Sequence, residues 1–391
     1  MIKTTIEKVA DIVNGATPST TDSENYGGEI VWLTPNDLSD QRTKYTFRGA
    51  RNITQKGLKS CSAKIVPKGT VLLTSRAPIG LLSIAKNELC TNQGFKNLVP
   101  KKGVIESEYL YYYLKLQVDN LNRIGAKTTF KEITKDDVAG FPIQILGNTD
   151  HQQKIAFVLS VLDDKIELNN KINAELEQMA KTLYDYWFVQ FDFPDANGNP
   201  YKSSGGAMVY NEALKREIPK DWEVKKLSDL LPVVTGKQDA NFATDDGEYN
   251  FFTCGEEILK CDTHEFEGKA VLVAGNGNFN IKLYDGKFNA YQRTYVLIPN
   301  EDKHYTVVYM AVRNRIRWLT SGSRGSIVKF ITKGDLEDIL LPLPGDESLD
   351  VFSSLNTLSE KIAKNIEENQ KLAELRDWLL PILINGQVKV E

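Results

Sequence analysis

The chain has 391 residues, of which 41% are hydrophobic and 26% are charged, and this length predicts two or three globular domains. No apolar run reaches the roughly 18 residues of a membrane-spanning helix, and the first residues lack the profile of a signal peptide. The four cysteines form no C-x2-C pair and only three histidines are present. We therefore expect neither disulfides nor a metal site, and we place the protein in the cytoplasm.

Basic residues are segregated, although the net charge is −4. No acidic residue lies between Asp40 and Glu88, whereas this stretch contains ten Lys or Arg residues: Arg42, Lys44, Arg48, Arg51, Lys56, Lys59, Lys64, Lys68, Arg76 and Lys86. A second group consists of Arg313, Arg315, Arg317 and Arg324. Basic stretches are often only solvated surface, but this density over so many residues favours contact with phosphates.

The first globular segment spans residues 1–150. Apolar runs bounded by Gly, Pro and Asn predict strands, and apolar residues at helical spacing predict a helix over 107–122. The expected strands are 30–33, 71–74, 81–85 and 95–99. This mixture predicts an α+β fold.

A long helical pattern follows within residues 151–190. Its apolar stripe has the spacing of a coiled-coil seam, which consists of Leu159, Leu162, Ile166, Asn169, Asn173, Leu176 and Leu183, with Ile172 and Met179 in the same stripe.

The second globular segment, residues 191–345, repeats features of the first. Strands are expected at 270–274 and 294–298, and a helix at 305–319. The opening at 226–236 resembles that at 8–15. Tyr291-Gln292-Arg293 occupies the place of Asn92-Gln93-Gly94, and 331–333 matches 133–135. We therefore predict one fold used twice with different loops, as two recognition tasks would require.

A second long helix is expected within residues 346–391, with Pro381 as its end. Its seam repeats the first at an offset of 196 residues and consists of Leu355, Leu358, Ile362, Asn365, Asn369, Leu372 and Leu379. Short connections favour antiparallel packing of the two helices, with a pseudo-two-fold axis between the globular segments. If the axis passes between Lys171 and Glu367, a position that the repeat offset alone does not fix, it pairs Asn169 with Asn369 and Asn173 with Asn365. Two alternatives remain open: helices that pack only on their own globular segments, and asparagines that lie in water.

No pattern for catalysis is convincing. Asn199-Pro200-Tyr201 has one proline too few for the motif of amino-methyltransferases, and Gly275-Asn276-Gly277 is best interpreted as a turn. We find no P-loop, no H-E-x-x-H motif and no carboxylate cluster with the spacing of a nuclease site.

Loops of small, amide and basic residues occur instead at equivalent places in both segments. Arg, Asn and Gln can read base edges, whereas Ser, Thr and Lys contact phosphates. The DNA-binding candidates in the first segment are Thr74, Ser75, Arg76, Asn92, Gln93, Lys96, Lys127, Thr128 and Thr129. Those in the second are Asn276, Asn278, Gln292, Arg293, Ser323, Arg324 and Ser326.

In this order the motifs give the chain a resemblance, over essentially its whole length, to the specificity subunits of type I restriction–modification systems. The residues that carry it are the two segment openings, Trp32-Leu33-Thr34-Pro35-Asn36-Asp37-Leu38, Asn92-Gln93-Gly94-Phe95, the run from Asp192-Phe193-Pro194 to Gly206, and Ile218-Pro219-x-x-Trp222.

The resemblance implies two target recognition domains, each of which reads one half of a split double-stranded DNA site, separated by two helical regions. It implies no catalytic residues in this chain. Two modification (methyltransferase) subunits would dock on the helices, and restriction subunits would add translocation and cleavage. S-adenosylmethionine, ATP and Mg would bind to those partners and not to this chain.

Two other classes of function remain open on the residues alone. A free-standing methyltransferase or nuclease would be active without partner proteins, and a structural coiled-coil adaptor would never bind DNA.

Overall fold

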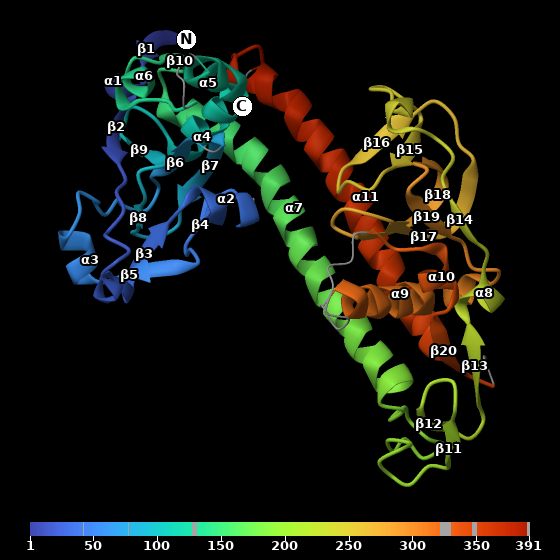
Figure 1. Cartoon of the computed structure of the whole chain (residues 1–391). Coiled ribbons are helices and arrows are strands. Elements are labelled where there is room, and N and C mark those ends of the chain that lie inside the picture. The colour runs from blue at the N-terminus through green and yellow to red at the C-terminus, as the bar shows by residue number, and fades with distance from the viewer. Residues whose placement is uncertain (42, 77, 127–130, 321–329, 346–349, 389–391) are drawn as a thin grey trace. The chain divides into compact units, whose positions relative to one another are not determined.

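The structure, a computed structural model, describes residues 1–41, 43–76, 78–126, 131–320, 330–345 and 350–388. The chain divides into two units (Figure 1). Unit 1 consists of Met1–Leu168 and Asn369–Glu391, and unit 2 of Asn169–Glu368. The two long helices, α7 (Thr149–Tyr184) and α11 (Asp350–Ile384), each contribute residues to both units.

Unit 1 begins with a mixed α/β domain. Its elements are β1 (Ile2–Thr5), α1 (Ile6–Val9), β2 (Ala10–Asn14), η1 (Ser23–Asn25), β3 (Tyr26–Leu33), α2 (Pro35–Gln41), β4 (Tyr45–Thr46), β5 (Arg51–Ile53), α3 (Gln55–Lys59), β6 (Val71–Ser75), β7 (Ile79–Ala85), β8 (Cys90–Thr91), β9 (Phe95–Pro100), α4 (Ser107–Leu116), α5 (Val118–Gly125), α6 (Lys135–Ala139) and β10 (Pro142–Ile145).

The main sheet of this domain has the strand order β2-β9-β6-β7-β4. Strand β6 lies at the centre of this sheet, and all five of its side chains are buried there. A second, two-stranded sheet pairs β1 with β10, and β5-β3-β8 form a third. The core below the main sheet joins β6 and α4 to both long helices through Leu73, Tyr109, Leu159 and Leu380.

Unit 2 contains a second mixed domain, preceded by a π-helical turn and a hairpin. Its elements are η2 (Asp185–Val189), β11 (Met208–Asn211), β12 (Arg216–Pro219), β13 (Trp222–Lys226), α8 (Leu227–Leu230), β14 (Val233–Thr235), η3 (Ala240–Phe242), β15 (Tyr249–Phe252), β16 (Ile258–Cys261), β17 (Phe266–Ala274), β18 (Ile281–Ala290), β19 (Thr294–Leu297), η4 (Asp302–His304), α9 (Tyr305–Thr320), α10 (Lys333–Glu337) and β20 (Leu340–Pro344).

The two domains share one topology. The main sheet of unit 2 has the order β14-β19-β17-β18-β15-β16, which repeats the five-stranded order of unit 1 and adds β16 at the edge. In both sheets the fifth strand is parallel to the fourth. The β13–β20 pair likewise repeats β1–β10. The prediction of one fold used twice is therefore confirmed.

A short capped helix follows each main sheet and explains one sequence repeat. The Thr134 hydroxyl accepts from the backbone N–H of Asp137, whose carboxylate accepts in return from the backbone N–H of Thr134. Thr332 and Asp335 form the same capping box before α10. Such caps stabilise a helix by about 1 kcal/mol, so the Ile-Thr-Lys repeat serves as a helix start in both domains.

The long helices are antiparallel within unit 2. The Asn365 amide donates to Asn173 Oδ1 at 2.8 Å, and the Asn169 amide donates to Glu368 at 2.7 Å. The predicted pairing of Asn173 with Asn365 is therefore present, whereas that of Asn169 with Asn369 stays a prediction. Asn169 and Asn173 are both buried, so these two do not lie in water.

The seam residues are buried or half-buried without exception. Leu159, Leu355 and Ile362 are buried, and the half-buried members are Leu162, Ile166, Leu176, Leu183, Leu358, Asn365, Asn369, Leu372 and Leu379. Ile172 and Met179 were expected in the same stripe, but they are exposed. The apolar pattern is wider than the surface that the neighbouring helix covers.

Each domain is attached to the long helices by polar contacts, which we term its joint. In unit 1, the nearly buried Lys44 ammonium contacts Ser160 and lies 2.7 Å from the Asp164 carboxylate. On the adjacent turn, Asp163 accepts from the Tyr112 hydroxyl at 2.7 Å and from the Arg376 guanidinium at 2.6 Å.

In unit 2 the equivalent helix positions make largely neutral contacts. Ser359, at the position of Asp163, bonds Thr306 at 2.9 Å. Asn356, at the position of Ser160, donates to the carbonyl oxygens of Asp302 and Lys303 at 3.1 Å. The one ion pair at these positions joins Glu360 to Lys269 at 2.9 Å.

Two expected helix boundaries are wrong. The helix predicted over 107–122 is divided at Gln117 into α4 and α5. Helix α11 does not end at Pro381 but continues to Ile384. The proline removes only one hydrogen bond near the end of the helix, and the burial of Leu383 and Ile384 in the unit 1 core favours the continued turn.

Candidate nucleic-acid interface

An open pocket of about 580 Å³ lies at the edge of the unit 1 domain. We call it the unit 1 pocket; its lining residues are Trp32, Thr34, Pro35, Asn36, Asp37, Ala50, Arg51, Arg76 and Asn92. It therefore joins the turn after β3 to the loops that follow β6 and precede β9.

One buried carboxylate fixes the turn that forms this pocket. Asp37 accepts from the backbone N–H and hydroxyl of Thr34 at 2.6 and 2.8 Å, and from the backbone N–H of Ala50 at 2.7 Å. The indole N–H of Trp32 donates to the carbonyl of Ala16 at 3.0 Å. The side chains of Asp37 and Trp32 thus fix the backbone of this turn. The groups of the pocket that remain to contact a ligand are basic and amide side chains.

A three-residue charge cluster adjoins the unit 1 pocket. The Arg76 guanidinium lies 3.9 Å from one carboxylate oxygen of Glu132, and the Lys96 ammonium lies 3.7 Å from the other. Lys96 is buried, with its ammonium 3.3 Å from the Ser75 hydroxyl, and burial lowers the pKa of its amine. The side chains of Arg76 and Glu132 are 38% and 36% exposed, so Arg76 is the basic member of this cluster that a ligand can reach.

Four other candidates in unit 1 have structural contacts. Thr74 and Ser75 are fully buried, and the Thr74 hydroxyl donates to the carbonyl of Pro78 at 2.7 Å. The Asn92 side-chain oxygen accepts from the N–H of Gly94 at 2.9 Å, and Gln93 is exposed and accepts from the Thr17 hydroxyl. Of these four, Asn92 and Gln93 present side chains at the surface, whereas Thr74 and Ser75 do not.

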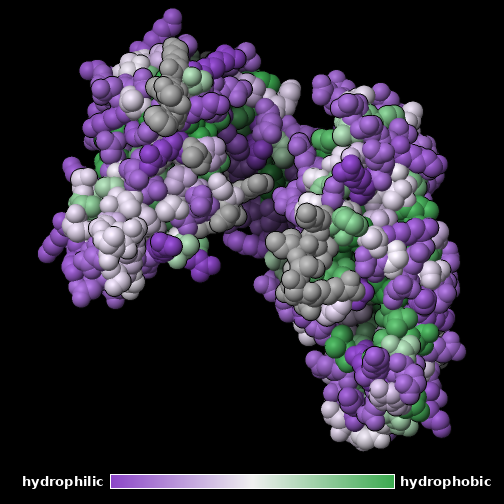
Figure 2. Space-filling view, viewed as in Figure 1, coloured by the Kyte–Doolittle hydropathy of each residue, from purple (hydrophilic) through white to green (hydrophobic). Residues whose placement is uncertain are grey.

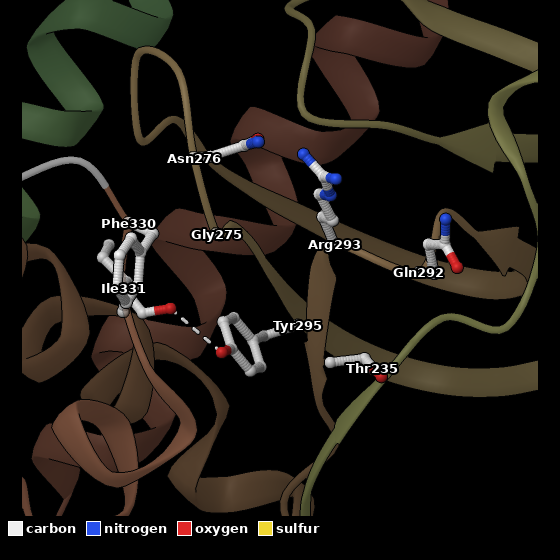
Figure 3. A pocket seen from close by; sticks show the side chains of 8 residues that line it. All are labelled: Thr235, Gly275, Asn276, Gln292, Arg293, Tyr295, Phe330 and Ile331. Atoms are coloured by element: carbon white, nitrogen blue, oxygen red, sulfur yellow. Dashed lines mark hydrogen bonds between the residues drawn. The ribbon is translucent and has the colours of Figure 1, made fainter.

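A second pocket, of about 420 Å³, lies in unit 2 and is drawn in Figure 3. We call it the unit 2 pocket; it is lined by Thr235, Gly275, Asn276, Gln292, Arg293, Tyr295, Phe330 and Ile331. The Tyr295 hydroxyl donates to the carbonyl of Ile331 at 3.0 Å, which fixes that wall. Gln292 and Arg293 are exposed. Asn278 lies in the neighbouring turn, where it accepts from the amide of Asn280.

The two pockets occupy the same place in the repeated fold. The N–H of Ser75 donates to the carbonyl of Gly94 at 2.8 Å, as that of Gly275 does to the carbonyl of Arg293 at 2.9 Å. The carbonyl of Ser75 accepts from Ile133, as that of Gly275 does from Ile331. The sheet registers then match Arg76 with Asn276, Gly94 with Arg293, Lys96 with Tyr295 and Glu132 with Phe330.

The remaining candidates, Lys127, Thr128, Thr129, Ser323, Arg324 and Ser326, lie outside the described residues. Glu132 and Phe330, which the sequence did not single out, stand next to those stretches. Glu132 could not have been found from its own neighbourhood, because its partners Arg76 and Lys96 are far away in the sequence.

The basic stretch of the first domain has several uses. Lys44 belongs to the joint, and Lys56 forms ion pairs with Asp22 and Glu24. Arg51 and Arg76 line the unit 1 pocket. In the second group, Arg313 forms an ion pair with Glu177 of α7 at 3.2 Å. Lys44, Lys56 and Arg313 therefore have carboxylate partners within the chain, and phosphate contact by the basic stretches stays a prediction.

Among the described residues, no helix has the length and apolar character to cross a membrane. Nor do these residues contain three or more His, Cys, Asp or Glu side chains grouped so that they could hold a metal ion.

Comparisons with known proteins identify the family. The family model described as the type I restriction modification DNA specificity domain matches residues 3–178 and 219–374, one match for each half of the chain. The MjaIX specificity subunit of Methanocaldococcus jannaschii is 35% identical, over 99% of this chain and 93% of the relative. The EcoDI specificity subunit of Escherichia coli is 40% identical, over 45% of this chain and 40% of the length of that relative.

A solved structure shows the same fold. The S subunit of a type I restriction–modification system from M. genitalium superposes with a TM-score of 0.61 and 18% identity, over 98% of this chain and 96% of the other. The free-standing enzyme and the structural adaptor are thus set aside in favour of a targeting role. With both halves matched by the family model, this chain belongs to the type I restriction–modification specificity subunits, the DNA-recognition and non-catalytic subunits of those systems.

Proposed function

We propose that each domain reads one half of a split double-stranded DNA site through its own pocket. The observation that carries this proposal is the occurrence of two pockets at equivalent places of a repeated fold, each with an arginine and amide side chains at its rim. Arg and amide groups are the usual readers of guanine and adenine in the major groove. Figure 2 shows that the visible surface of each domain is predominantly hydrophilic. This is expected for a protein–DNA interface, which is polar and contains ordered water.

The long helices then set the distance between the two readers. Two linked domains bind more tightly than either alone, provided that the linker spans the separation of the half-sites. A helical linker fulfils this condition for one spacer length, since it has a fixed rise of about 1.5 Å per residue.

The helices are also the proposed docking sites for two modification subunits. Several large apolar side chains on α7 and α11 are exposed, and such residues mark interaction sites when they gather on one surface. In unit 1 they are Phe157, Val161, Leu168, Leu375 and Trp378, and in unit 2 they are Ile172, Met179 and Ile366. Met179 and Leu375 are equivalent positions of the repeat, as two copies of one partner would require.

Cofactors are assigned to the partners. S-adenosylmethionine would bind to the modification subunits, and ATP and Mg to restriction subunits. The complex would act in the cytoplasm, where reduced thiols persist, in agreement with four free cysteines in this chain.

The spacing proposal is tested by lengthening both helices. Seven residues inserted after Lys171 and after Glu367, equivalent positions of the repeat, add about 10 Å to each helix. The preferred DNA spacer should grow by about 3 bp, at roughly 3.4 Å per base pair. Mapping of methylated adenines, produced by the chain together with its modification subunits, measures the spacer.

A matched control receives the insertion in α7 alone, which shifts the seam against α11 and should abolish specific methylation. An unchanged spacer in the double insertion would contradict the proposal, since the half-sites would then be positioned by something other than helix length.

A further inference from the structure

The two pockets contain arginines that differ in how they are held. Arg76 is paired with Glu132, and the second oxygen of that carboxylate is engaged by the buried Lys96. Glu132 is therefore bound from two sides, and its position restricts the rotamers open to Arg76. Arg293 stands in the unit 2 pocket without such a partner, since within the described part of the chain its guanidinium forms no ion pair.

Neutral residues replace the two partners of this cluster in unit 2. Phe330 takes the place of the carboxylate of Glu132, and Tyr295 takes the place of the ammonium of Lys96. Figure 3 shows the Arg293 side chain extended into the open while Tyr295 turns toward Ile331. Among the described residues, Arg293 is thus a cation without a carboxylate partner at the rim of its pocket, whereas Arg76 lies beside the carboxylate of Glu132.

Restraint decides which DNA group an arginine can read. Two parallel hydrogen bonds to guanine O6 and N7 require the guanidinium plane in one orientation, so a fixed arginine discriminates among bases. A phosphate carries no sequence information, and its oxygens accept hydrogen bonds from several directions, so an arginine that no carboxylate holds in place can still bind it.

We propose that Arg76 is the specificity-determining residue of the first domain and reads a guanine, that Glu132 is its positioning residue, and that Arg293 contacts a phosphate. The base contacts of the second domain then come from Asn276 and Gln292, whose amides match adenine. This inference rests on the proposed function, because it presupposes that both pockets contact DNA.

Lysine substitutions separate the two roles, because lysine keeps the charge but cannot form the bidentate contact. The full chain, in complex with its modification subunits, is first used to select its site from a randomised double-stranded DNA library. Binding is then measured by fluorescence anisotropy to that site, to every single-base variant of it and to an unrelated duplex, at several salt concentrations.

We expect Arg76→Lys to reduce the preference for guanine at one position of one half-site by roughly 5- to 150-fold, the value of one bidentate contact. Binding to the unrelated duplex should change by less than about threefold, because the charge is retained. Arg293→Lys should leave every base preference unchanged. Arg293→Ala should weaken binding to all duplexes alike and reduce the slope of log K against log salt by about 0.9.

Glu132→Gln tests the positioning role. It preserves the size of the side chain and adds no positive charge, so a purely structural role would leave base preference unchanged. We expect it to lower the guanine preference at the same position as Arg76→Lys while the binding of the modification subunits stays as in the parent chain.

The outcomes are distinguishable. An unaltered guanine preference in Arg76→Lys, or an equal loss of preference in Arg293→Lys, overturns the inference while the proposed function stands. A parent complex that selects no sequence from the library refutes the proposed function itself.

Discussion

Units 1 and 2 use one topology but attach their domains to the long helices by different chemistry. In unit 1, equivalent helix positions carry Asp163 and Asp164. Asp163 binds Arg376 and Tyr112 in a nearly buried ion pair and a hydrogen bond, and Asp164, itself 57% exposed, binds the nearly buried Lys44. In unit 2 they carry Ser359 and Glu360, with a hydroxyl contact and one ion pair, whose Lys269 is 20% exposed. The comparison shows that a repeated fold conserves the place of a joint and not its charges.

This difference has an energetic consequence. A buried ion pair is expensive to break, because the remaining partner is left charged in a poor solvent, whereas a neutral hydrogen bond between hydroxyls contributes about 1 kcal/mol. The joint of unit 1 should therefore tolerate substitution less well than that of unit 2.

The largest effect is expected at Asp163. Asp163→Ala leaves Arg376 and Tyr112 without their shared acceptor, and only 11% of the Asp163 side chain is exposed. We expect a loss of about 3–5 kcal/mol in the free energy of unfolding. The equivalent Ser359→Ala should lose about 1 kcal/mol. Urea denaturation followed by far-UV circular dichroism measures both, and equal losses would show that the two joints do not differ.

A smaller effect is expected at the lysines of the two joints. Lys44→Met removes an ammonium that is 3% exposed and bonded to Ser160 and Asp164, and should cost about 1.5–3 kcal/mol. Lys269→Met removes a lysine that is 20% exposed and paired with Glu360, and should cost less than about 1 kcal/mol. Added salt should reduce the difference between the two losses only slightly, because the nearly buried Lys44 ammonium is poorly screened; equal losses at high salt would show that both lysines act as surface charges.

The smallest effect on stability, with the opposite sign, is expected at Lys96. Burial lowers the pKa of the Lys96 amine in the folded chain below the ordinary 10.5. As the pH falls, this amine is therefore protonated in the unfolded chain before it is protonated in the folded chain. Because the unfolded state binds the proton more tightly, Lys96 destabilises the folded state at neutral pH. Lys96→Met should leave the melting temperature at neutral pH unchanged or raised, while DNA binding weakens. Tyr295→Phe, at the equivalent position, adds no charge and serves as the control. A lowered melting temperature in Lys96→Met would mean that its pairing with Glu132 outweighs burial.

Much of the fold could be predicted because its signals are local. The strands around Val71 and Phe95 are short apolar runs, and the long helices follow from a seam repeated at 196 residues. The pairing of Asn173 with Asn365 was predicted by placing the two-fold axis between Lys171 and Glu367, which the repeat allows but does not fix. Boundaries failed where packing overrode a local rule, as at Pro381, where the buried Ile384 extends the helix.

The site was predictable only in part. Arg76, Asn92, Asn276, Gln292 and Arg293 were found as residue types suited to DNA, and they line the two pockets. Thr74 and Ser75 have the same suitability in sequence, but they belong to a central strand and are buried. Composition cannot distinguish these two groups, because exposure depends on which strand lies at the centre of the sheet.

The sequence by itself determined the repeat, the two long helices and the family, since each is a pattern of residue types along the chain. Only the tertiary structure decided the assignment of individual charges: Lys44 to a buried joint, Arg76 to a pocket beside Glu132. The physical reason is that an ion pair forms between residues distant in sequence, and its strength depends on the burial that the assembled fold gives to both partners.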